Sequence, residues 1–95
     1  MTRDEILFKT RAQRAFLREL HVRELALFGS YARGEARSAS DIDFFVEFDE
    51  ASFDCYMALK EFLESLLGQK VDLVLKSAIK PRLRDAILRE AVRAA

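Results

Sequence analysis

Three segments of the chain carry apolar residues at the spacing of an amphipathic helix. The first runs to about Leu20, and the third begins at Pro81. The second covers Phe53–Leu67 and is followed by Gly68. Glycine is typical directly after the last turn of a helix, and proline is favoured in the first turn. The pattern therefore predicts three helices, and the buried stripe of the last one is expected to consist of Leu83, Ala86, Ile87, Ala91 and Val92.

Three short runs rich in apolar and β-branched residues predict strands. The first, Glu24–Phe28, stops at a Gly-Ser pair that is typical of a tight turn. The second is Asp41–Phe48 and the third is Val71–Leu75. Because side chains alternate along a strand, one face of the second strand is expected to hold Ile42, Phe44, Val46 and Phe48, and the other Asp41, Asp43, Phe45 and Glu47.

The order of these elements predicts a small mixed β-sheet of about three or more strands flanked by helices, an α/β (α+β) fold. A chain of 95 residues has the usual size of one domain, so we expect a single domain over residues 1–95. Half of the residues are hydrophobic (51%) and a third are charged (34%). This composition indicates a folded chain and argues against intrinsic disorder.

Charge and hydropathy exclude several classes of protein. The 16 basic residues balance the 16 acidic ones, so there is no net positive charge for broad binding of nucleic acid. No apolar run approaches the roughly 20 residues of a membrane span, and the N-terminus lacks the apolar core of a secretory signal. The single cysteine, Cys55, has no partner for an internal disulfide. We therefore expect a cytoplasmic protein with no membrane association.

Three aspartates interrupt the predicted strands. Asp41 and Asp43 are two residues apart, so both side chains should leave the same face, with Cα atoms roughly 6–7 Å apart. Asp72 interrupts the third apolar run and would lie close to Asp43 if the two strands are neighbours. Three carboxylates at one place repel one another unless a cation compensates, and such hard oxygen ligands suit Mg²⁺. Two ions roughly 3.5–4 Å apart can hold the attacking and leaving oxygens of a phosphoryl displacement. Asp41, Asp43 and Asp72 are therefore the candidate metal-binding and catalytic residues.

A candidate phosphate-binding turn lies just upstream of the aspartates. Gly29 lets the backbone approach a phosphate closely, and the helix start that follows it attracts anions. Ser30 offers a hydroxyl to the same oxygens, and Arg33 offers a cationic fork. The ten residues Tyr31–Ser40 are enough to let the two strands lie side by side with the turn and the acids at one end. Gly29, Ser30 and Arg33 are therefore the candidate nucleotide-binding residues, and a nucleoside triphosphate fits the combination.

Each of these motifs also has a simpler structural interpretation. An isolated Asp-x-Asp before a strand often only caps a turn. Its combination with a Gly-Ser turn and an acid inside another apolar strand is more typical of a site. Arg33 is either a phosphate contact or a solvated surface charge. Four arginines predicted on the last helix form either a solvated face or a contact with an acidic or RNA-bound partner: Arg82, Arg84, Arg89 and Arg93.

The spacing of these residues resembles that of the nucleotidyltransferase superfamily that includes DNA polymerase β. The shared features are the Gly-Ser pair, ten intervening residues, the Asp-x-Asp pair and the later Asp72. The stretches Leu27–Glu35 and Ser40–Asp43 are similar to the minimal nucleotidyltransferase branch of that superfamily. The likeness continues through Lys70–Val74 and Lys80–Arg84, so it covers nearly the whole chain.

This resemblance implies a specific activity. Members of the branch are typically antitoxins whose partner toxin is a small helical HEPN ribonuclease, and characterised members transfer AMP from ATP to a tyrosine hydroxyl of that toxin. By resemblance, Asp41 and Asp43 are metal ligands shared with the nucleotide, and Asp72 ligates the catalytic metal and draws the proton from the acceptor hydroxyl. Gly29 and Ser30 take the triphosphate. The expected cofactor is Mg²⁺, as two ions, with ATP as the substrate and pyrophosphate as a product.

Two other functions stay open at this point. The protein could neutralise a toxin by binding alone, with a vestigial site, or it could modify a small molecule. The intact set of acids argues against a vestigial site, because clustered carboxylates without a cation lower stability. Roughly 20 residues follow the third predicted strand, too few for a second domain that would hold a small acceptor. A protein acceptor with its own folded surface therefore fits the chain length better.

Overall fold

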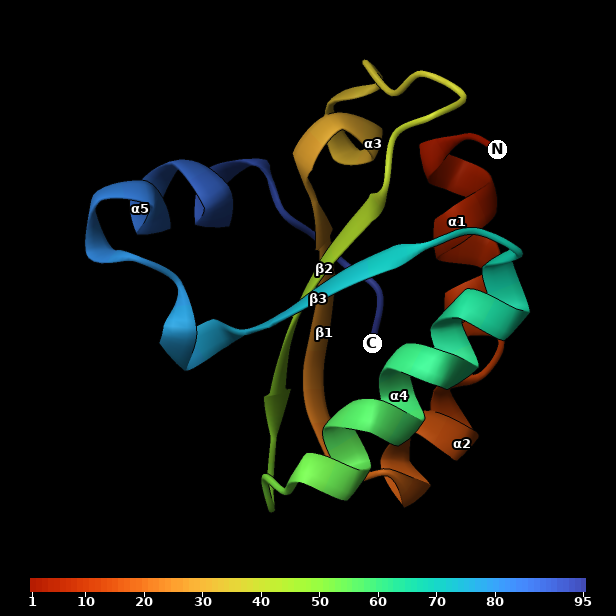
Figure 1. Cartoon of the computed structure of the whole chain (residues 1–95), viewed down its shortest axis with the longest axis vertical. Coiled ribbons are helices and arrows are strands. Elements are labelled where there is room, and N and C mark those ends of the chain that lie inside the picture. The colour runs from red at the N-terminus through yellow and green to blue at the C-terminus, as the bar shows by residue number, and fades with distance from the viewer.

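The protein contains a four-stranded mixed β-sheet, described by a computed structural model over residues 1–95 (Figure 1). The strand order is β3-β2-β1-β4. β1 (Val22–Phe28) pairs antiparallel with β2 (Ile42–Phe48) on one side and with β4 (Val92–Arg93) on the other. β2 also pairs in parallel with β3 (Val71–Leu75). This arrangement confirms the predicted fold class of a small mixed sheet flanked by helices.

Helices cover the two faces of the sheet unequally. α1 (Arg3–Arg11), α2 (Arg14–Glu19) and α4 (Phe53–Leu67) lie on one side, and α5 (Pro81–Glu90) lies on the opposite side (Figure 1). The short helix α3 (Gly29–Arg33) follows directly from the end of β1. The 3-10 turn η1 (Lys76–Ala78) connects β3 to α5. The sheet therefore has one well-covered face and one face that α5 covers only in part.

The core reflects this asymmetry. The face toward α1, α2 and α4 holds a cluster of 18 buried hydrophobic residues, whose β1 members are Val22, Leu25 and Leu27. The alternate β1 residue, Ala26, belongs to a cluster of only three buried residues with Phe45 and Ile79 on the α5 side. Because strand side chains alternate between faces, Asp43 is on the same thinly covered face as Phe45. The sheet thus places its acids on the side with the smaller core.

Helix α4 has the predicted bounds because both of its ends carry strong sequence signals. The Ser52 hydroxyl accepts a hydrogen bond from the Cys55 backbone N–H at 3.1 Å, which satisfies an otherwise free donor of the first turn. Gly68 follows the helix in the left-handed conformation, at φ +66°. The predicted stop at this glycine is confirmed.

The prediction of one helix up to about Leu20 is wrong, since the chain breaks between α1 and α2. The Thr10 hydroxyl donates to the Ile6 carbonyl oxygen at 2.7 Å, a side-chain bond of the kind that bends helices. The break turns Leu17 into the core while Ala15 and Phe16 stay exposed. The hydrophobic stripe predicted for this segment is therefore interrupted.

The prediction for the last helix is also partly wrong. No residue of α5 is fully buried, and Leu83 and Ala86 of the expected stripe are exposed. The helix ends at Glu90, and Val92 and Arg93 form β4 instead of a further helical turn. β4 supplies hydrogen-bond partners to an edge of β1 that would otherwise be open.

None of the helices is both long enough and apolar enough to span a membrane.

Candidate active site

Two of the three candidate acids are neighbours across adjacent strands. Asp43 of β2 lies opposite Asp72 of β3 in the parallel register, so both side chains leave the same face of the sheet. Asp41 lies one residue before β2. Asp41 and Asp72 are exposed, whereas Asp43 is partly buried. The expectation that Asp72 would lie beside Asp43 is thus met by the strand pairing.

The Gly-Ser turn lies directly against the acids. Phe28, the last residue of β1, is the register partner of Asp43, so the next residue, Gly29, begins beside that carboxylate. Gly29 has φ +76°, a conformation that favours glycine. A Cβ atom at Gly29 would overlap Oδ2 of Asp43. Both backbone conformation and space therefore require glycine at this position.

The pKa of Asp43 is strongly raised. Burial and the negative charges of Asp72 and Asp41 raise the pKa of Asp43 from 3.8 to about 6. Glu90 contributes in the same direction, and the positive charge of Arg33 opposes the rise. The carboxylate is therefore held where its ionised form is disfavoured unless a cation is near.

Arg33 lies at the end of α3 and contacts two glutamates. Its Nε donates to Glu35 Oε1 at 2.8 Å, and its Nη1 donates to both oxygens of Glu90 at 3.0 and 3.2 Å. These hydrogen bonds to Glu35 and Glu90 raise the pKa of Arg33, so its charge is permanent. Its guanidinium thus lies within electrostatic reach of Asp43 and is engaged by carboxylates.

Glu90 is a site residue that sequence reasoning missed. Its Oε2 accepts a hydrogen bond from the backbone N–H of Gly29 at 2.6 Å, although the two residues are 61 positions apart. The same carboxylate binds Arg33, so Glu90 contacts two of the three groups that were predicted to bind a triphosphate. No local signal identifies it, because a glutamate near arginines on a polar helix is typical of a solvated face. Only the packing of α5 against α3 brings it here.

The acids do not make up a metal-binding cluster by themselves. No three Asp, Glu, His or Cys side chains lie close enough together to hold a metal ion by themselves. Asp43 and Asp72 nevertheless present hard carboxylate oxygens side by side, and burial and neighbouring negative charges raise the pKa of Asp43. Mg²⁺ commonly takes one or two carboxylates and fills its other positions with water and substrate phosphates. The donor set therefore fits a magnesium ion that a bound nucleotide helps to ligate.

Comparisons with known proteins agree with this arrangement. A family model described as a nucleotidyltransferase domain matches residues 10–94. The chain is 46% identical over 94 residues to the protein adenylyltransferase MntA of Thermococcus cleftensis, covering 97% of this chain and 95% of that protein. A solved structure described as a minimal nucleotidyltransferase matches with a TM-score of 0.84 and 38% identity, over 97% of this chain and 95% of the other. A toxin–antitoxin structure with AMP-PNP matches with a TM-score of 0.71 and 25% identity, over 90% of this chain and 72% of that chain.

Proposed function

The chain belongs to the nucleotidyltransferase domain family, and we propose that it is an antitoxin that transfers AMP from ATP to a tyrosine hydroxyl of a HEPN-type partner toxin. The observation that carries this proposal is the contact of the Gly29 turn with Asp43, beside Asp72. The 46% sequence identity to a protein adenylyltransferase over nearly the full chain supports a protein acceptor. Likeness to a toxin–antitoxin structure with AMP-PNP supports ATP as donor and a toxin as partner.

The triphosphate would bind at the start of α3. The backbone of Gly29 and the hydroxyl of Ser30 can donate hydrogen bonds to phosphate oxygens, and Arg33 adds a guanidinium fork. In the structure described here, Glu90 holds the Gly29 N–H and Arg33. Binding of the triphosphate at these groups therefore requires the Glu90 carboxylate to move away.

The acids would act on the α-phosphate and on the acceptor. Asp41, Asp43 and Asp72 would hold Mg²⁺, as two ions, which when bound supplies positive charge to the phosphate oxygens. The tyrosine oxygen forms a bond to the α-phosphorus while the bond from that phosphorus to the bridging oxygen of the β-phosphate breaks. Pyrophosphate leaves with the electron pair of that bond, and Asp72 takes the proton of the tyrosine hydroxyl. Positioning and electrostatics would supply most of the acceleration, as is usual in phosphoryl transfer.

The test is AMP transfer to a partner protein, for which we would use the product of the adjacent gene. The chain, ATP, Mg²⁺ and this partner are incubated together, and the intact mass of both proteins is measured. We expect an AMP-sized increase on the partner, located at a tyrosine by peptide sequencing. The matched variant Asp41→Asn with Asp43→Asn should still bind the partner but transfer no AMP.

Two results would contradict the proposal. Absence of the mass increase with a folded, partner-bound wild-type chain would exclude AMP transfer to this partner. Full neutralisation of the toxin by the double Asn variant in cells would show that binding alone silences the toxin.

A further inference from the structure

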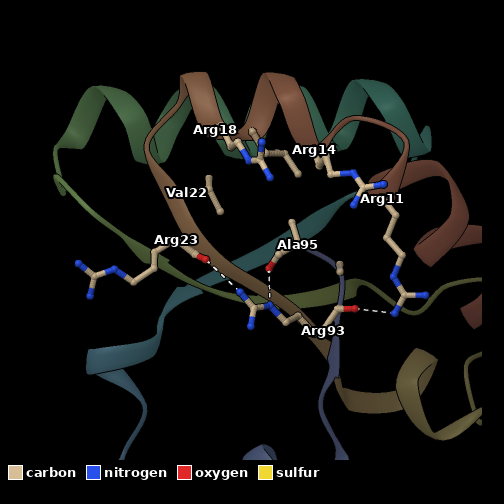
Figure 2. A pocket seen from close by; sticks show the side chains of 9 residues that line it. Arg11, Arg14, Arg18, Val22, Arg23, Arg93 and Ala95 are labelled. Carbon is tan, nitrogen blue, oxygen red and sulfur yellow. Dashed lines mark hydrogen bonds between the residues drawn. The ribbon is translucent and has the colours of Figure 1, made fainter.

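One pocket of the protein lies far from the candidate active site. It has a volume of about 540 Å³ and opens between the end of α1, α2, the start of β1 and β4 (Figure 2). Gly29 lies at the other end of β1, roughly 20 Å away at about 3.3 Å per residue. Five of the nine lining residues are arginines: Arg11, Arg14, Arg18, Arg23 and Arg93. We call this feature the arginine pocket.

The positive charge of the arginine pocket is largely unpaired. Of the five arginines, only Arg23 pairs with acidic side chains, at 2.7 Å from Asp49 and 4.0 Å from Glu47. Figure 2 shows its side chain pointing away from the other arginines. The side chains of Arg14 and Arg18 have no hydrogen-bond or ion-pair partner, and no acidic side chain lines the pocket. The nearby Asp4, which lines an adjoining hollow with Arg11 and Arg14, pairs with Arg3 at 3.2 Å.

Two of the arginines are held in place by backbone oxygens. Arg11 donates to the Arg93 carbonyl oxygen at 2.6 Å. Arg93 donates to the carbonyl oxygens of Ala95 at 3.0 Å and Arg23 at 3.4 Å (Figure 2). These bonds orient the two guanidiniums, and the donors that the bonds do not use stay free for an anion. The pocket is therefore preorganised for negative charge, which reduces the ordering needed on binding.

The remaining lining restricts the class of anion. Three of the four apolar lining residues, Leu17, Val22 and Ala94, are buried, and Ala95 is half-buried. The lining contains no aromatic side chain on which a base could stack. A protein interface would also be expected to offer a buried aromatic or aliphatic anchor point. Several guanidinium forks around one concave volume suit ligands with many oxygens, such as adjacent phosphates, better than a single planar carboxylate.

We propose that the arginine pocket is a metal-independent binding site for a ligand with neighbouring phosphate groups. The same chemistry is offered by a free polyphosphate and by the phosphodiester backbone of RNA. The volume lies within the roughly 300–1,000 Å³ of small-ligand sites, which accommodates either a free polyphosphate or a short backbone segment. This site is separate from the proposed ATP site and does not depend on it.

The proposal is tested by calorimetric titration of the chain with tripolyphosphate in buffer containing EDTA. We expect binding that Arg14→Gln with Arg18→Gln weakens at least about tenfold, because charge-assisted bonds are lost. The matched control, Arg82→Gln with Arg89→Gln, removes two charges from exposed α5 and should leave the affinity within about twofold. Arg33→Gln is titrated alongside, because the proposed ATP site also contains groups that can bind a triphosphate. Circular dichroism and thermal melting verify that each variant is folded.

The outcomes separate the sources of phosphate and the competing explanations. Displacement of tripolyphosphate by a short RNA without terminal phosphates would identify the backbone as the source, and failure to displace it would identify a free polyphosphate. Equal weakening by the α5 control would overturn the proposal in favour of non-specific charge attraction. Loss of binding only in Arg33→Gln would place the ligand at the ATP site and also overturn it. Tighter binding of a polyglutamate peptide than of tripolyphosphate would assign the pocket to an acidic protein segment instead.

Discussion

Glu90 accepts a hydrogen bond from the backbone N–H of Gly29 at 2.6 Å, and its two oxygens also contact Arg33. A carboxylate of the last helix thus accepts hydrogen bonds from two of the groups proposed to bind the triphosphate. The Glu90 carboxylate also adds negative charge beside Asp43, whose pKa it helps to raise. Glu90 and a bound triphosphate therefore compete for the same donors.

We expect Glu90→Gln to tighten ATP binding. The substitution removes a negative charge that repels the triphosphate, and it weakens the hydrogen bonds to Gly29 and Arg33 that ATP must displace. We expect an effect of about 1 kcal/mol, or roughly fivefold in the affinity for ATP. Titration with a non-hydrolysable ATP analogue and Mg²⁺ measures it. Glu35→Gln is the matched control, since Glu35 contacts Arg33 but not Gly29. Weaker ATP binding in Glu90→Gln would mean instead that Glu90 positions Arg33 for the nucleotide.

Gly29→Ala is expected to be far more damaging than Gly34→Ala. Both glycines have positive φ, at +76° and +72°, so alanine at either position costs about 1–2 kcal/mol in backbone strain. Only at Gly29 would the added methyl group also overlap a neighbour, the Asp43 carboxylate, whereas nothing lies within 4 Å at Gly34. Forcing atoms apart adds about 1–3 kcal/mol. Urea unfolding of the two variants gives the difference, and equal destabilisation would show that the Gly29 turn relaxes freely.

The raised pKa of Asp43 predicts a pH-dependent contribution to stability. Because the folded-state pKa is about 6 and the ordinary value is 3.8, the folded state favours the protonated form. The stabilisation is complete below about pH 3.8 and is lost as the pH rises through 6. Asp43→Asn should therefore raise the free energy of unfolding at pH 8, but not at pH 4. A shift of about two pKa units corresponds to about 3 kcal/mol, which partial exposure reduces to roughly 1 kcal/mol.

The measurement is thermal or urea unfolding of wild type and Asp43→Asn between pH 4 and pH 8 without Mg²⁺. The control is Asp49→Asn, which removes an exposed acid outside the site. A constant difference between Asp43→Asn and wild type across the range would contradict the assigned ionisation.

Core packing can be tested with two phenylalanines of opposite exposure. Phe44 of β2 is 0% exposed, whereas Phe53 at the start of α4 is 76% exposed. Phe44→Ala should destabilise the fold by about 3–5 kcal/mol through lost burial and a cavity, and Phe53→Ala by less than about 0.5 kcal/mol. Chemical unfolding measures both. A large loss for Phe53→Ala would reveal packing that the isolated chain does not show.

Local patterns predicted the parts of the fold that depend on local structure. Helix α4 and strand β3 have the predicted bounds. A helical apolar pattern that stops at Gly68 marks α4, and a short apolar run broken only by Asp72 marks β3. Strand β4 was not predicted, since Val92 and Arg93 become a strand only by pairing with Leu27 and Ala26. A segment of two residues is too short to show the alternating pattern of a strand. Its structure is set by pairing with the free edge of β1.

The residues of the candidate site likewise include some that the sequence predicted and one that it did not. Asp43 and Asp72 were predicted to be neighbours from two apolar runs that each contain an acid, and the parallel pairing of β2 with β3 brings them together. Glu90 was missed because its role depends on how α5 packs against α3, a long-range contact with no sequence signature. Site residues that lie in a strand or turn motif can be predicted from the sequence. Site residues that reach the site from an element far away in the sequence, such as Glu90, cannot.

The pairing of β4 with β1 has a practical consequence for handling the protein. Ala94 is only 1% exposed, and its backbone N–H donates to the Leu25 carbonyl oxygen at 2.7 Å. An affinity tag fused directly after Ala95 would therefore start at the sheet edge, five residues after Glu90. A tag before Met1, which is exposed, avoids that edge. Purification handles for binding assays accordingly belong at the N-terminus.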